Sequence, residues 1–173
     1  NFLKDLLIFY TSEESQQTLK EYHDNMPESQ KAIYYCTADT VKHAMSLPQC
    51  EDVRSRGYEI LYLTHPIDET VLQQLRMYEG KPFTNIITDD LGFQTEEEKK
   101  AAEEQTVQNK DLFDFMVESI GDENLKKVTL SSKLVSSSCC LTTQGGLTLE
   151  MEKYFRNGPS EAMRNLRAER VLE

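Results

Sequence analysis

Three residues near the middle of the chain, His65, Asp68 and Glu69, have side chains that could carry acid–base chemistry. They lie in the stretch THPIDE, directly after an apolar run that predicts a buried strand. Open α/β sheets place ligands at the carboxyl ends of their parallel strands, so a small α/β enzyme is one hypothesis. The other is structural, and we favour it, because acidic residues suit a first helical turn and Pro66 is typical of a helix start.

No motif for catalysis or cofactor binding accompanies these residues. The sequence has no G-x-G-x-x-G, P-loop or G-x-S-x-G motif, and Gly145-Gly146 alone does not indicate a phosphate site. Cys36, Cys50, Cys139 and Cys140 include no C-x-x-C pair, so zinc-site spacing is absent. A disulfide between the adjacent Cys139 and Cys140 needs a strained ring, so we expect reduced, structural thiols and a cytosolic protein.

A second group of residues recurs at positions i, i+4, i+7 and i+8: Leu147, Met151, Tyr154 and Phe155. This spacing predicts one apolar stripe on a helix of about three turns. The stripe could face the core, as most amphipathic helices do, or it could be exposed for recognition. The flanking Gly145-Gly146 and Asn157-Gly158-Pro159 favour a hinged helix. Met conforms to varied apolar partners, so an exposed stripe would suit adaptable binding.

The elements that must position these residues follow from the apolar periodicity. Residues 32–36, 59–64 and 83–88 are predicted strands, with helical stretches between them that end at Gly57 and Gly80. This alternation predicts right-handed crossovers and a parallel sheet with helices packed on it. The predicted fold class is α/β (α+β overall): a small three-layer α/β/α unit with a short, mainly parallel sheet, followed by a second small mixed α/β unit.

Outside this pattern, helices are predicted over 2–10 and 18–26, and from Ser160 towards the end of the chain. Residues 94–106 are almost purely charged and polar, which indicates a solvated helix or a linker at a domain boundary. Residues 126–132 and 139–143 alternate like strands of a small sheet. The start without Met suggests a piece of a longer protein, and the final Leu-Glu is either native or a cloning scar.

Composition excludes several classes of partner. The 173 residues, 38% hydrophobic and 28% charged, are typical of a globular protein with one ordinary or two small domains. No apolar run approaches the ~20 residues that span a bilayer, so no membrane partner is expected. The net charge of -11 argues against nucleic acid, because such binding relies on Lys and Arg neutralising phosphates.

The stretches KAIYYCTADT, HPIDETVLQQLRMYEGKPF and MEKYF, in this order and spacing, resemble the ninety-kilodalton heat-shock protein family of chaperones, the HtpG type included. The resemblance covers residues 1–173 and is weakest between about 133 and 148. It implies that residues 1–104 end the family's middle domain, as a helical coil (1–26), a small α/β/α unit (27–93) and an acidic linker (94–104). Residues 105–173 would begin the carboxyl-terminal domain, without its dimer helices.

The resemblance also implies a function: binding unfolded or incompletely folded client proteins within an ATP-dependent, cytoplasmic, homodimeric folding machine of the stress response. ATP and Mg belong to an amino-terminal domain upstream, so no catalytic, cofactor or metal residue is expected in this chain. The family's client-facing amphipathic helix falls on LTLEMEKYF. Met151 and Phe155 match it best, while Leu147 and Tyr154 follow from the stripe. The preceding SSSCCLTTQGG departs from the family pattern and leaves the helix start open.

Overall fold

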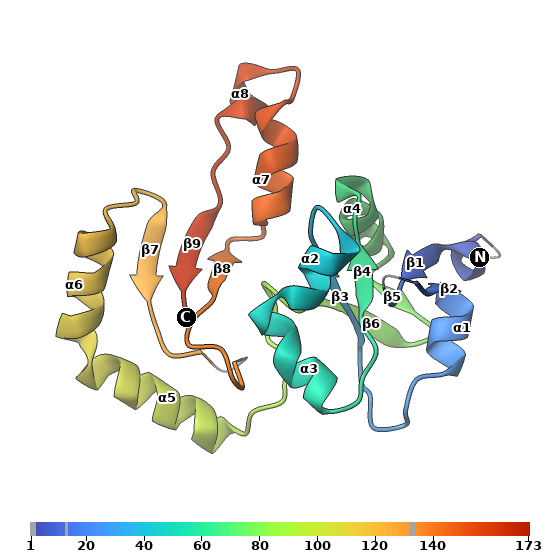
Figure 1. Cartoon of the computed structure of the whole chain (residues 1–173), viewed down its shortest axis with the longest axis horizontal. Coiled ribbons are helices and arrows are strands. Elements are labelled where there is room, and N and C mark those ends of the chain that lie inside the picture. The colour runs from blue at the N-terminus through green and yellow to red at the C-terminus, as the bar shows by residue number, and fades with distance from the viewer. Residues whose placement is uncertain (1–2, 13, 132–133) are drawn as a thin grey trace. The chain divides into compact units, whose positions relative to one another are not determined.

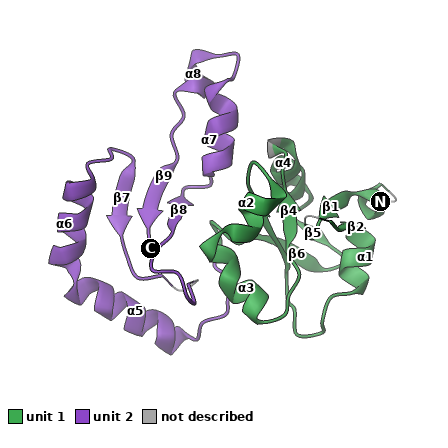
Figure 2. Ribbon diagram, in the orientation of Figure 1, with its two compact units in different colours: residues 1–89 green, residues 90–173 purple. Residues whose placement is uncertain are grey.

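The structure is a computed structural model that describes residues 3–12, 14–131 and 134–173. The chain divides into two compact units, residues 1–89 and 90–173, shown in different colours in Figure 2. Each unit has a sheet of its own, six-stranded in the first and three-stranded in the second. None of the helices among the described residues is long and apolar enough to cross a membrane.

The first unit is built on a mixed sheet with the strand order β2-β1-β4-β3-β6-β5 (Figure 1). Its three central strands run parallel: β4 (Leu61–Leu63), β3 (Ile33–Thr37) and β6 (Lys81–Asn85). Antiparallel strands flank them: β1 (Ile8–Tyr10), β2 (Gln16–Thr18) and β5 (Met77–Tyr78). The predicted α/β class is confirmed, with the parallel pairing confined to the centre of the sheet.

Side chains alternate along β3, and all five of its residues are buried. Both faces of the sheet are therefore covered by helices. Ile33 and Tyr35 point into an apolar cluster that includes residues of α1 (Leu19–Asp24) and α4 (Pro66–Leu75). Cys36 points to the other face, towards Ala44 of α2. The helices on that side are α2 (Val41–Ser46), the 3-10 helix η2 (Pro48–Cys50) and α3 (Glu51–Ser55). The predicted α/β/α layering is therefore confirmed, and Figure 1 shows α2 and α3 on the opposite side of β3 from α1.

The helix predicted over residues 2–10 is wrong. Only a 3-10 turn, η1 (Lys4–Leu6), forms there, and Ile8–Tyr10 become β1; Phe2 lies outside the described residues. Pairing with β2 and β4 buries Phe9, and this long-range contact outweighs the local helical spacing. The predicted helix over 18–26 is confirmed as α1, so the described part of residues 1–26 holds two strands and one short α-helix.

The second unit begins with two helices, α5 (Glu96–Gln108) and α6 (Lys110–Ile120). A capping box between Thr95 and Glu98 starts α5, which buries none of its residues. The charged stretch is therefore a solvated helix, one of the two alternatives predicted for it. Gly121, with φ 65°, ends α6 in the left-handed conformation that glycine adopts readily.

The sheet of the second unit has the order β7-β9-β8, formed by β7 (Leu125–Val128), β8 (Leu141–Gln144) and β9 (Glu169–Leu172). Two helices, α7 (Leu149–Arg156) and α8 (Glu161–Arg164), connect β8 to β9. The helix predicted from Ser160 to the chain end is confirmed only for α8. Its last part is wrong, because β9 inserts between two strands and buries Val171.

Candidate functional site

The helix that carries the predicted apolar stripe is α7, and local sequence explains where it starts. The Thr148 hydroxyl accepts a hydrogen bond from the Met151 N–H at 3.2 Å, which caps the amino end. Acidic residues occupy the first turn and Lys153 and Arg156 the last, as the helix dipole favours. Leu147 precedes the cap, so three residues of the stripe are helical and the fourth leads into the helix.

The buried side of α7 is polar. Glu152 is only 2% exposed and Thr148 only 3%. One Glu152 oxygen accepts from the backbone N–H of Ala168 at 2.9 Å, and the other pairs with Arg156 at 2.8 Å and with Arg170 of β9 at 3.6 Å. The helix is therefore attached to the segment leading into β9 through a charged anchor.

Burial by itself raises the pKa of Glu152. The Ala168 N–H, the Arg156 hydrogen bond and the charge of Arg170 outweigh that effect, so the pKa of Glu152 lies below its usual value. Arg170 also pairs with Asp122, whose pKa is lowered by the Asn124 N–H and by Arg170. These interactions connect α7, β9 and the turn before β7 in one ionic network.

The apolar stripe lies beside this anchor. Each helical residue rotates the direction of its side chain by about 100°, so Met151 and Phe155 flank the Thr148 and Glu152 side while Tyr154 points away from it. Met151 and Phe155 are accordingly half-buried, as is Leu147, whereas Tyr154 is 60% exposed. The rings of Tyr154 and Phe155 meet edge to face at 5.7 Å. The stripe is thus neither wholly in the core nor wholly exposed.

The glycines on both sides of α7 lie where the backbone conformation or a close contact disfavours a larger residue. Gly145 and Gly146 have φ angles of 80° and 82°, which L side chains rarely adopt. A Cβ atom on Gly158 would lie 2.9 Å from the Phe155 carbonyl oxygen. These glycines determine how the chain enters and leaves the helix, and the predicted hinge movement stays a prediction.

The three residues of the enzyme hypothesis face different surroundings. His65 is exposed and precedes α4, and Asp68 is half-buried, where burial raises its pKa against the opposing effect of His65. Glu69 is fully buried and accepts a hydrogen bond from the Asn85 side-chain amide at 2.8 Å. Glu69 therefore connects α4 to β6, which is a structural role and the one that the sequence favoured.

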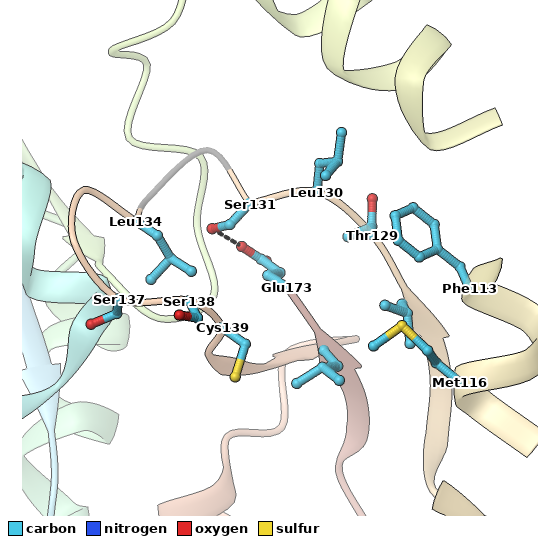
Figure 3. Close-up of a pocket in the computed structure, with 12 residues that line it drawn as sticks. Phe113, Met116, Thr129, Leu130, Ser131, Leu134, Ser137, Ser138, Cys139 and Glu173 are labelled. Atoms are coloured by element: carbon cyan, nitrogen blue, oxygen red, sulfur yellow. Dashed lines mark hydrogen bonds between the residues drawn. The ribbon is translucent and has the colours of Figure 1, made fainter. Parts of the chain in front are cut away.

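The second unit also contains a pocket of about 310 Å³ that sequence reasoning missed (Figure 3). Apolar side chains from α6 and from the strand ends line it, together with hydroxyl groups. The Glu173 carboxylate at its edge already accepts from Ser131 and Thr142, each at 2.9 Å. Through these bonds, Glu173 connects the end of β9 to β8 and to the segment after β7.

No cluster of three or more His, Cys, Asp or Glu side chains among the described residues could hold a metal ion. The four cysteines are free thiols, of which Cys139 is exposed and the others are buried.

Comparison with known proteins extends this picture to the whole chain. The family model described as Hsp90 protein matches residues 1–173. The chain belongs to the Hsp90 family. It is 44% identical over 172 residues to the chaperone protein HtpG of Bacillus subtilis and 43% identical over 172 residues to that of Clostridium acetobutylicum. Each match covers 99% of this chain but 27% of the HtpG protein, so the chain spans about a quarter of the length of these relatives.

Among solved structures, the middle domain of a Plasmodium falciparum heat shock protein is similar to this Hsp90 chain. Its TM-score is 0.46 at 31% identity, and the match covers 49% of this chain and 36% of that one. Membership of the Hsp90 family agrees with the resemblance seen in the sequence.

Proposed function

We propose that this chain is a client-binding part of an ATP-dependent chaperone of the HtpG type, and that the stripe of Leu147, Met151, Tyr154 and Phe155 contacts unfolded or incompletely folded proteins. One observation carries the proposal: α7 packs through Thr148 and Glu152, which leaves Tyr154 60% exposed beside two half-buried apolar side chains. A helix that had only a core role would bury its apolar side first.

Binding at this surface is apolar burial, at roughly 25 cal/mol for each Å² removed from water. Met163 and Leu166, 38% and 43% exposed, extend the apolar surface beyond α7. Rotating α7 to hide its stripe would break the bonds of Glu152 and leave the buried Ala168 N–H without this acceptor, which is costly. The ionic anchor therefore keeps the stripe available to clients.

The remaining properties belong to the whole protein and are part of the same proposal. Residues 1–104 would be the end of the middle domain and residues 105–173 the start of the carboxyl-terminal domain. ATP and Mg²⁺ would bind an amino-terminal domain outside this chain and supply the hydrolysis that drives rearrangement. The full protein would be a cytoplasmic homodimer without nucleic-acid or membrane partners. The net charge of -11 argues against nucleic acid as a partner.

The test is fluorescence anisotropy of a labelled, permanently unfolded protein titrated with this chain and with its Met151→Ser, Tyr154→Ser variant. Removing two apolar contacts should weaken binding about tenfold or more, since each buried side chain contributes roughly 1.5–3 kcal/mol. Circular dichroism and thermal melting check that the variant stays folded.

The matched control is Phe115→Ser on α6, because Phe115 is 65% exposed but lies outside the stripe. It should bind the unfolded protein as the unchanged chain does. If the α7 variant binds as tightly as the unchanged chain, the client surface lies elsewhere in the chain. If the unchanged chain does not bind the unfolded protein, the chain has a scaffold role instead.

A further inference from the structure

Two buried thiols meet on the face of the first sheet that α2 and α3 cover. Cys36 lies in β3 and Cys50 ends η2, and both are 0% exposed. Their sulfur atoms are 3.6 Å apart, and both sulfurs approach the carbonyl oxygen of Ala44, at 3.9 and 3.6 Å. Fourteen positions separate the two cysteines, so no short motif in the sequence marks them as neighbours.

We propose that Cys36 and Cys50 are a modification site, a dithiol that low-molecular-weight disulfides of the glutathione class oxidise reversibly to an intramolecular disulfide. The sulfurs must approach from 3.6 Å to about 2.05 Å. Cys36 is held in a central strand, and Cys50 ends a three-residue 3-10 helix, so the approach requires η2 to move towards β3. Oxidation removes both S–H groups that approach the Ala44 carbonyl oxygen. This oxygen still accepts a hydrogen bond from the Leu47 N–H at 3.3 Å, so it does not lose its last donor.

The reaction is two thiol–disulfide exchanges. The Cys50 thiolate attacks the small disulfide, forms a mixed disulfide and releases one small thiolate. Cys36 then loses its proton and attacks the Cys50 sulfur, which forms the Cys36–Cys50 bond and releases the second small thiolate. Two electrons pass to the small disulfide, and the two protons from the protein thiols complete the two small thiols. Because both sulfurs are buried, the first attack proceeds through local opening around η2.

The surroundings of the pair favour Cys50 as the attacking group. The hydrogen bond between the two sulfurs and the positive charge of Arg54 lower the pKa of Cys50 against the effect of burial. The neighbouring Cys50 and burial raise the pKa of Cys36. Arg54 is held at this place by a hydrogen bond to the Met45 carbonyl oxygen.

The disulfide would close the stretch 36–50, which contains α2, and would restrict the unfolded chain more than the folded one. Oxidation should therefore raise the thermal unfolding midpoint by about 5 °C or more. In reducing compartments such bonds are usually transient, which agrees with a site that responds to oxidative conditions.

The experiment uses the full chain in two versions, one with Cys139→Ser and Cys140→Ser, and one with Cys36→Ala and Cys50→Ala. Each is incubated natively with glutathione disulfide, alkylated, digested with trypsin and analysed by mass spectrometry. Cleavage after Lys31, Lys42 and Arg54 places the two thiols in peptides 32–42 and 43–54.

We expect the first version to yield peptides 32–42 and 43–54 joined by a disulfide, to lose the mass of two hydrogen atoms, to melt higher, and to revert with dithiothreitol. The second version should only acquire glutathione at the exposed Cys139, which shows that the oxidant is active. The proposal is overturned if the first version stays reduced under these conditions, if Cys50 stops at the mixed disulfide, or if linkage requires denaturant.

Discussion

At the scale of single residues, Glu152 determines how α7 packs against Ala168 and β9. It is a charged residue on the buried side of a helix whose apolar side chains lie beside it. Its two oxygens accept from the Ala168 N–H and pair with two arginine side chains, so the cost of burying the carboxylate is offset locally.

Replacing Glu152 with Ala should therefore destabilise the second unit by about 2–4 kcal/mol, because the buried Ala168 N–H loses its acceptor and Arg170 loses one of its two acidic partners. Urea unfolding followed by circular dichroism measures this change. The control is Glu161→Ala, an exposed acidic residue in the first turn of α8, which should cost less than about 1 kcal/mol. Equal costs for both variants would contradict the anchoring role.

The lowered pKa of Glu152 also predicts how stability depends on pH. A depressed carboxyl pKa stabilises the folded state above its ordinary value of 4.5, and this contribution is lost as pH falls through the folded pKa. The stability difference between the unchanged chain and Glu152→Gln should stay constant from neutral pH to about pH 5 and shrink in more acidic solution. Urea titrations at several pH values measure it, and a difference that grows on acidification would contradict the assignment.

At the scale of elements, α4 packs on the first sheet through apolar side chains and through a polar contact of Glu69. Leu72 of α4 is fully buried in the core cluster, and Glu69 accepts the Asn85 amide of β6. His65, which precedes the same helix, is exposed and makes no side-chain cap.

We expect Glu69→Ala to cost about 2–3 kcal/mol of stability, since the buried Asn85 amide loses its acceptor. His65→Ala should change stability by less than about 0.5 kcal/mol, because His65 is exposed. It should also leave binding of unfolded protein unaffected. Thermal melting and the anisotropy assay test both statements; a hydrolytic or transfer activity that disappears with His65→Ala would restore the enzyme hypothesis.

At the scale of the whole molecule, the two units have separate cores. The first is centred on β3 and β4, and the second on Leu125, Val128, Ala168 and Val171. Each sheet also completes its strand pairing within its own unit.

Separate cores predict separate unfolding, which native-state hydrogen exchange can resolve. Glu152→Ala should accelerate exchange in β8 and β9 about tenfold for each 1.4 kcal/mol lost and leave β3, β4 and β6 unchanged. Glu69→Ala should produce the reverse pattern. If either variant accelerated exchange in both sheets equally, the chain would unfold as one cooperative body.

The sequence by itself determined the features that depend on neighbouring residues. Thr40 and Ser160 cap helices as their types predict, Gly121 ends α6, and the apolar strands at the centre of the first sheet were recognisable from their composition. The Hsp90 resemblance was visible for the same reason, since long motifs are read directly from the chain. Helix caps and turns form between residues a few positions apart, so local spacing contains the necessary information.

Only the tertiary structure decided the features that depend on distant partners. Residues 8–10 and 169–172 became strands because their hydrogen bonds go to segments elsewhere in the chain, which overrode helical spacing. The burial of Glu152 depends on Ala168 and Arg170, and the contact of Cys36 with Cys50 depends on how η2 folds back over β3. Such contacts are set by the free energy of the whole packed unit, and residue spacing alone does not encode them.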